Sequence, residues 1–188
     1  ILPSSSVVNG SCSACVQTDM KFINAYSSVS HCALVLFALL MMTRVSCTGA
    51  ILQMLSHGLM TALFFALIGM IYGRTHTRDI RELGGLMKIM PFLSVGYVIA
   101  GLANLGLPGF SGFIAEMTIF NGSFENADTF HRCCTIIAIT SIVVTAVYIL
   151  RTVGFILFHK VKNPHFEELT AAPWDERVAG CCRVLCVA

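Results

Sequence analysis

Charged side chains are scarce in this sequence. Asp, Glu, Lys and Arg make up 12% of its 188 residues, whereas soluble domains carry about 25%. Apolar residues reach 56%, and the mean hydropathy is +0.79. This balance excludes an ordinary soluble domain and predicts a membrane protein. The net charge is only +2 and no basic patch with interleaved aromatics occurs, so nucleic-acid binding has no support.

Metal-binding and targeting patterns are also lacking. The nine cysteines include one C-x-x-C, formed by Cys12 and Cys15, without a second one or a suitably spaced His. Packing is therefore favoured over a metal or thiol-redox site, which stays the alternative. The chain starts at Ile1 without a basic region and a cleavable apolar core. We therefore expect a fragment, an incomplete chain or one product of a split gene.

Long runs almost free of charge predict the membrane-spanning segments. The expected helices cover residues 22–43, 45–73, 89–124 and 131–158. About 20 apolar residues cross a bilayer, so the third segment is too long for one straight helix. It contains Gly106, Pro108 and Gly109, and a proline frees backbone carbonyls that need protein or a hydrated cavity around them. The sequence predicts an all-α polytopic transmembrane bundle with one discontinuous helix, broken near Pro108, and a pair of short helices is the alternative.

The basic residues predict the topology of the membrane domain, residues 19–158. If each segment crosses once, one side receives ten basic residues: Lys21, Arg74, Arg78, Arg81, Lys88, Arg151, Lys160, Lys162, Arg177 and Arg183. The other side receives Arg44 and Arg132. The first side should therefore face the matrix or cytoplasm. Residues 1–18 are typical of the end of an earlier transmembrane helix, and residues 159–188 of a loop on the matrix side followed by the start of a further segment.

Three ionisable side chains lie deep within the predicted spans. Glu116 is the lone charge of its segment, and a buried charge costs several kcal/mol unless it is hydrated or paired, so it marks a functional site. His31 lies about 14 Å into its helix, and His57 is similarly interior. Because His changes charge near neutral pH, three such groups on neighbouring helices indicate a proton pathway. A packing role is the alternative for each histidine.

Polar residues along the first span extend this hypothesis. Lys21 lies at its positive-side mouth, where it either serves the pathway or reaches to the interface as an anchor. Hydroxyls of Tyr26, Ser27, Ser28 and Ser30 lie between Lys21 and His31. They either support a file of water or bond to backbone carbonyls.

Several ordered motifs carry a family resemblance. They are QTDMKFINAYSSVSH at 17–31, QMLSHGL at 53–59, YGRTHTRD at 72–79, GGL at 84–86 ahead of Met90 and Pro91, and LPGFSGFIAE at 107–116. Together they closely resemble the subunit 4 family of respiratory complex I, NADH:ubiquinone oxidoreductase, over roughly residues 16–165. This is an antiporter-like, proton-pumping subunit of the membrane arm.

The resemblance implies specific roles. His31 and His57 would belong to the central connection of a hydrated axis, and Glu116 would end that axis on the broken helix. Sibling subunits and multisubunit cation/proton antiporters usually have Lys at this position, so Glu116 favours subunit 4. The chain resembles the second half of the family, and the expected partners include a separate chain that supplies the first half.

The resemblance implies the kind of enzyme complex, and the length, which suggests a split or truncated chain, favours a mitochondrion as its setting. We expect a non-redox, proton-translocating subunit of a mitochondrial enzyme, in the inner membrane among other membrane-arm subunits, antiporter-like neighbours and lipids. The chain itself is expected to bind no cofactor, whereas the complex uses NADH, FMN, iron–sulfur clusters and ubiquinone. A plastid or bacterial homologue is an alternative. A cation/proton antiporter subunit and a structural remnant are the competing functions.

Overall fold

The protein is a bundle of long helices. The computed structural model describes residues 2–125 and 128–159, with residues 178, 180–182, 184 and 186. The helices are α1 (Leu2–Val16), α2 (Met20–Leu40), α3 (Arg44–Thr75), α4 (Leu86–Ile89), α5 (Pro91–Asn104), α6 (Ser111–Phe124), α7 (Thr129–Val153) and the π-helical turn η1 (Gly154–Phe158). Three segments are long and apolar enough to cross a membrane, namely α2, α3 and residues 129–158. The predicted all-α membrane bundle is confirmed.

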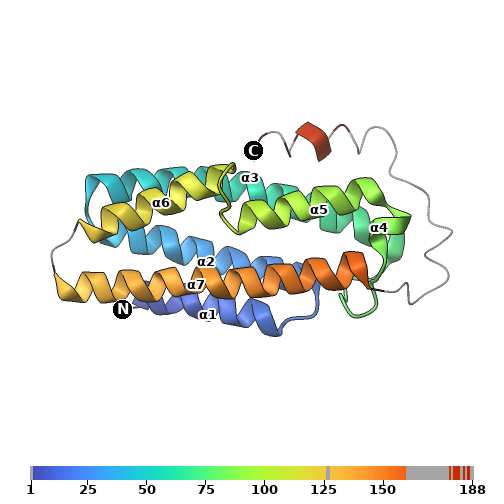
Figure 1. Cartoon of the computed structure of the whole chain (residues 1–188), viewed down its shortest axis with the longest axis horizontal. Coiled ribbons are helices and arrows are strands. Elements are labelled where there is room, and N and C mark those ends of the chain that lie inside the picture. Colours follow the sequence, from blue (N-terminus) through green and yellow to red (C-terminus); the bar gives the residue numbers. More distant parts are fainter. Residues whose placement is uncertain are drawn as a thin grey trace.

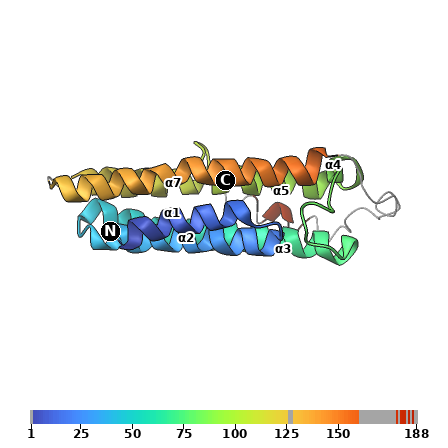
Figure 2. The same cartoon turned by 90° about the horizontal axis from the view of Figure 1, so that it is seen from below.

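The third predicted segment is a broken helix. Helix α5 ends at Asn104 and α6 begins at Ser111, with Pro108 in the interval. Figure 1 shows α5 and α6 end to end beside α3, so this segment crosses the bundle once. In Figure 2, α1, α2 and α3 form one layer, and α5 and α7 lie in the other. The predicted discontinuous helix is confirmed, because α5 and α6 follow one another in a single crossing and do not form two separate crossings.

Side-chain caps explain where two of the long helices begin. The Asp19 side chain accepts a hydrogen bond from Lys21 N (2.8 Å) at the start of α2, and Thr43 Oγ1 accepts one from Ser46 N (3.1 Å) at the start of α3. Such caps satisfy backbone donors that have no partner inside the helix. Helix α3 ends at Thr75, and the next residue, His76, adopts a left-handed conformation with φ 53°. These signals set the lengths of α2 and α3.

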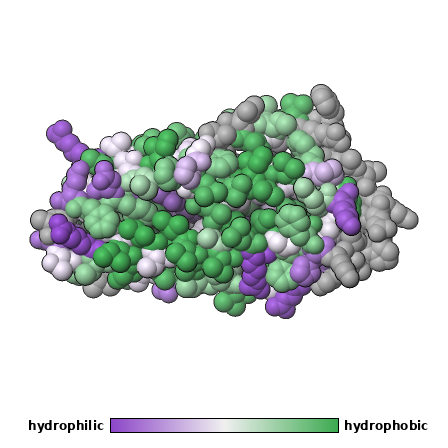
Figure 3. Space-filling model, viewed as in Figure 1, coloured by the Kyte–Doolittle hydropathy of each residue, from purple (hydrophilic) through white to green (hydrophobic). Residues whose placement is uncertain are grey.

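Two apolar clusters fill the bundle, one toward each end. One includes Leu63, Leu67 and Leu93, and the other includes Leu34 and Ile119. Large apolar side chains also cover the outside, and Figure 3 shows hydrophobic residues over the middle of the visible face, with hydrophilic ones mostly toward its ends. An exposed apolar surface of this extent is typical of a protein that faces lipid or partner subunits.

The broken helix packs very closely on α3 through glycines. A Cβ on Gly122 would lie 2.3 Å from Ser46 N, and one on Gly49 would lie 2.7 Å from Ile119 N. Small residues let membrane helices approach to backbone contact, where van der Waals packing and polar bonds hold them. This contact fixes α6, and therefore Glu116, against α3.

The basic residues of the two ends separate as the topology predicts. Helix α2 begins at the same end of the bundle at which α3 and α7 finish (Figure 1). The loop after α3 is joined to the start of α2, since Met20 N donates to Arg78 O (3.0 Å) and Ile80 N donates to Thr18 O (2.9 Å). Which end faces the matrix stays a prediction. Lys160, Lys162, Arg177 and Arg183, with nearly all of the segment 159–188, lie outside the described residues.

Candidate functional site

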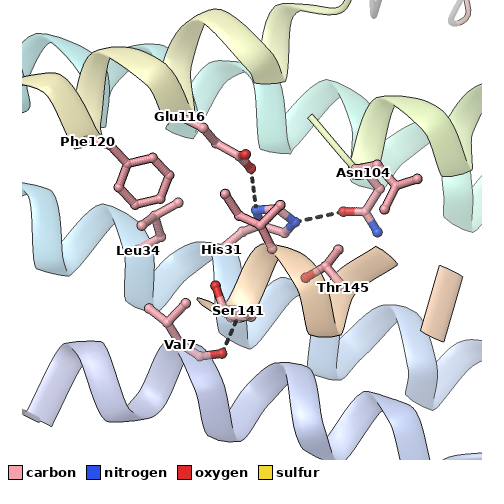
Figure 4. Close-up of a pocket in the computed structure, with 11 residues that line it drawn as sticks. Val7, His31, Leu34, Asn104, Glu116, Phe120, Ser141 and Thr145 are labelled. Atoms are coloured by element: carbon pink, nitrogen blue, oxygen red, sulfur yellow. Dashed lines mark hydrogen bonds and ion pairs between the residues drawn. The ribbon is translucent and has the colours of Figure 1, made fainter. Parts of the chain in front are cut away.

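His31 lies at the centre of a buried polar cluster between the two apolar clusters. Its ring belongs to α2 and is 8% exposed as a residue. Its Nε2 is 2.7 Å from Asn104 Oδ1, and its Nδ1 is 3.1 Å from Gln53 Nε2 and 3.8 Å from Glu116 Oε1. Figure 4 shows the imidazole between Glu116 and Asn104. Both ring nitrogens therefore face polar groups from other helices.

Glu116 occupies the space opened by the helix break. Gly106 in that break has a φ of +61°, which favours glycine, and a Cβ there would lie 2.6 Å from Glu116 Oε2. The carboxylate is buried on α6, one turn and a half after that helix begins at Ser111. The break therefore gives the carboxylate its place beside His31.

His57 adds a second imidazole from α3. Its ring centroid lies 5.1 Å from that of His31, with the planes tilted by 30°. His57 is half-buried, and Thr61 Oγ1 lies 3.3 Å from its Nε2. Three groups that change charge by gaining or losing a proton thus meet in one place, contributed by α2, α3 and α6.

A branch of neutral polar groups continues from His31 toward α7. Asn104 Nδ2 donates to Ser27 Oγ (3.1 Å), and the Tyr148 hydroxyl donates to the same oxygen (2.7 Å). Both Asn104 and Tyr148 are almost fully buried. Hydrogen bonds therefore link the last turn of α5, the middle of α2 and the C-terminal part of α7 through one serine.

The hydroxyl groups on α2 that were predicted to support a file of water lie in different surroundings. Ser27 joins the branch just described, whereas Ser30 bonds to Ser11 Oγ (2.9 Å) and to Val7 O (2.8 Å) in α1. Tyr26 is 37% exposed on the outside of the bundle. Of these residues, Ser27 alone is hydrogen-bonded, in the described residues, to a group that also contacts His31.

The structure brings three of the four predicted pathway residues together. Lys21 is the exception, because it is exposed at the start of α2, about 15 Å along the helix from His31. Pro108 and Gly109 lie in the break with Gly106, and Gly109 has a φ of +108°. The break and the three ionisable groups form one site, and Lys21 lies apart from it.

Sequence reasoning missed Gln53, Asn104 and Tyr148. Each is a polar side chain within an apolar helix, which is the signal that singled out the histidines. Gln53 precedes His57 by four residues, so the two share one face of α3. Asn104 is the last residue of α5, directly before the break. Their partners come from other helices, so the helix packing alone shows which residue each one contacts.

A small cavity borders His31 and Glu116. Polar groups of Ser30, Ser141 and Thr145 line it together with these two residues and Asn104. The space open to a water molecule is about 10 Å³, which is about the minimum that one water requires. The site therefore combines titratable groups with polar walls that suit a bound water.

These features define a polytopic membrane protein with ionisable groups buried beside a broken helix. The chain belongs to the family described as NADH:quinone oxidoreductase/Mrp antiporter, TM, whose model matches residues 1–145. It is 37% identical over 158 residues to NAD(P)H-quinone oxidoreductase chain 4 1 of Nostoc sp., covering 82% of this chain and 29% of that protein. It is 35% identical over 167 residues to NADH-quinone oxidoreductase subunit M of Rickettsia felis, covering 87% and 33%. The predicted relationship to subunit 4 of complex I is confirmed.

Solved structures share the fold. A chain of respiratory complex I from Thermus thermophilus matches with a TM-score of 0.90 and 25% identity, covering 99% of this chain and 38% of that one. A chain of the Mrp complex from Dietzia sp. matches with a TM-score of 0.83 and 21% identity, covering 98% and 20%. This chain spans about a third or less of the length of the Nostoc and Rickettsia relatives. That it corresponds to their second half stays a prediction.

Proposed function

We propose that this chain is a proton-translocating, non-redox part of the membrane arm of NADH:ubiquinone oxidoreductase. One observation carries the proposal: His31 lies within 3.8 Å of the Glu116 carboxylate and 5.1 Å from the His57 ring, inside an apolar bundle. Placing three such groups inside an apolar bundle is costly unless they exchange protons or hold ligands. The relatives, which are named as quinone oxidoreductase subunits, support the enzyme complex as the setting.

The chain's own groups suffice for a local proton relay. A proton leaves the Glu116 carboxyl and bonds to His31 Nδ1, which leaves a carboxylate and an imidazolium. His57, whose ring lies against that of His31, is the next group for the charge along α3. Water in the cavity beside His31 would bridge gaps too long for direct transfer. Quinone reduction elsewhere in the complex would shift these groups in turn.

The partners and location follow the same proposal. Other membrane-arm subunits, antiporter-like neighbours and lipids would surround the exposed apolar surface, and a separate chain would supply the first half of the subunit. NADH, FMN, iron–sulfur clusters and ubiquinone would be bound by other subunits. The mitochondrial inner membrane is the proposed location. Because both named relatives are bacterial, a bacterial membrane is the competing location.

Replacement of Glu116 tests the proposal. In the assembled complex in proteoliposomes, Glu116→Gln should lower the number of protons pumped per NADH oxidised, while NADH oxidation by an artificial acceptor stays normal. The matched control is Glu125→Gln, because Glu125 follows the same helix and is exposed. Normal pumping in an assembled Glu116→Gln complex would refute this role.

A cation/proton antiporter subunit is the second candidate. The family itself includes the Mrp antiporters, and buried carboxylate and imidazole groups would serve either function. Purification of the native complex separates the two, because flavin and iron–sulfur subunits accompany the chain only in the oxidoreductase. Cation-dependent proton exchange without those subunits would favour the antiporter.

A further inference from the structure

Gln53 contacts the ring nitrogen of His31 that faces Glu116. Its side chain is 2% exposed, and its Nε2 lies 3.1 Å from His31 Nδ1. Its Oε1 is buried and, within the described part of the chain, has no hydrogen-bond partner. A buried amide oxygen without a partner is costly and calls for an explanation.

In this arrangement the other nitrogen of His31 is a donor. Asn104 Oδ1 lies 2.7 Å from His31 Nε2, while Asn104 Nδ2 donates to Ser27. An amide oxygen accepts hydrogen bonds and does not donate them, so Nε2 carries a proton. In the neutral ring Nδ1 is then bare, and it accepts from the Gln53 amide group. Proton exchange by His31 is thereby confined to Nδ1.

Protonation of Nδ1 would conflict with this arrangement. The Gln53 NH₂ group and the new Nδ1–H would both be donors, 3.1 Å apart in the present geometry. A half-turn of the amide removes the conflict, because it exchanges Nε2 for the unpartnered Oε1. The neutral ring accepts from the amide NH₂ group, and the charged ring donates to the amide oxygen.

We propose that Gln53 is a positioning residue whose amide reverses when His31 gains or loses a proton at Nδ1. The inference rests on the proposed proton-translocating function and adds a gate to it. While Gln53 donates to Nδ1, it occupies the lone pair that Glu116 would protonate. When the proton moves from the Glu116 carboxyl to Nδ1, the Gln53 oxygen accepts from the new N–H and holds the charged ring in place.

Among the described residues, few charged or titratable groups lie around His31. Glu116 faces it from α6 and His57 from α3. Helices α5 and α7 present the neutral groups of Asn104, Ser141 and Thr145. Apart from Glu116 and His57, therefore, the residues around the ring respond to its charge through hydrogen bonds alone. Gln53 is the neutral residue that faces the same ring nitrogen as Glu116.

Substitution of Gln53 gives the first test, in the assembled complex in proteoliposomes. Gln53→Met keeps the length of the side chain and removes both faces of the amide. Coupled proton pumping should fall about tenfold, the equivalent of about 1.4 kcal/mol, with artificial-acceptor activity unchanged. Ser56→Ala is the matched control, since this buried hydroxyl on α3 pairs with Ser111 Oγ (3.0 Å), and it should pump normally. Normal pumping by Gln53→Met would overturn the inference.

The tautomer of His31 gives a second test, because the proposed gate requires a bare Nδ1 in the neutral ring. Nitrogen NMR of the complex labelled with ¹⁵N-histidine can identify the His31 signals as those missing from His31→Gln. At high pH, the wild type should show a protonated Nε2 and a bare Nδ1, and the opposite tautomer would overturn the inference. Glu116→Gln distinguishes a failure of the gate from a failure of the proposed function. If it stops pumping while Gln53→Met does not, the gate alone fails; if Glu116→Gln pumps normally, the proposed function fails.

Discussion

Gly106 and Glu116 fit together so closely that a side chain at residue 106 would meet the Glu116 carboxylate. A Cβ added to Gly106 would lie 2.6 Å from Glu116 Oε2 and 3.1 Å from its Cδ. The break between α5 and α6 therefore does more than interrupt the backbone hydrogen bonds of one helix. It provides the space in which the carboxylate lies beside His31.

Gly106→Ala should displace this carboxylate and lower both stability and pumping. The added methyl group contacts the carboxylate, and the left-handed conformation costs a residue with a Cβ about 1–2 kcal/mol. Gly109→Ala is the matched control, because Gly109 has a φ of +108° but open space around its Cβ position. It should lower the melting temperature of the assembled complex but leave pumping normal. Equal pumping defects in the two variants would show that strain, not the contact with Glu116, is responsible.

The close packing of α6 on α3 makes a separate prediction. Gly122→Ala should destabilise the assembled complex by about 1–3 kcal/mol, the usual cost of overpacking, because the new methyl group meets the backbone at Ser46. Gly58→Ala in α3 has open space at its Cβ and should be neutral or slightly stabilising. Thermal unfolding followed by loss of the membrane-arm subunits measures both. A stable Gly122→Ala complex would contradict the close contact.

Asn104 and Asn24, which are both buried, should respond differently to replacement by leucine. Asn104 holds His31 Nε2 and bonds to Ser27, so Asn104→Leu leaves buried donors without partners, at about 1–3 kcal/mol. Asn24 is equally buried, but its Nδ2 has no partner in the described residues. Asn24→Leu should therefore cost less, and only Asn104→Leu should impair pumping. Melting temperature and proton pumping of the two assembled complexes measure the difference. Equal effects would refute the role given to Asn104.

Much of the fold can be predicted from the sequence, because bilayer length and charge are local properties. The nearly charge-free runs locate the spanning helices, and Pro108 between two glycines locates the break. Glu116, His31 and His57 stand out because each is ionisable within an apolar stretch. That they meet in space follows from the helix packing, which brings α2, α3 and α6 together.

The rest of the site depends on which way each side chain faces. Tyr26, Ser27, Ser28 and Ser30 form one run of hydroxyls in the sequence, yet Ser27 reaches the site and Tyr26 faces outward. Helical periodicity places residue 27 four positions before His31, on the same face of α2, so this part was predictable. Gln53, Asn104 and Tyr148 were not, because their partners lie on other helices, up to 121 positions away along the chain.

The central claim is that His31 carries protons between groups of this buried cluster. The most direct measurement compares proton pumping per NADH oxidised in assembled complexes that carry His31→Gln or His76→Gln. His76 is exposed at the end of α3, so its replacement should leave pumping unchanged. We predict that His31→Gln pumps fewer protons while oxidising NADH normally with an artificial acceptor. Equal and normal pumping by both complexes would contradict the claim.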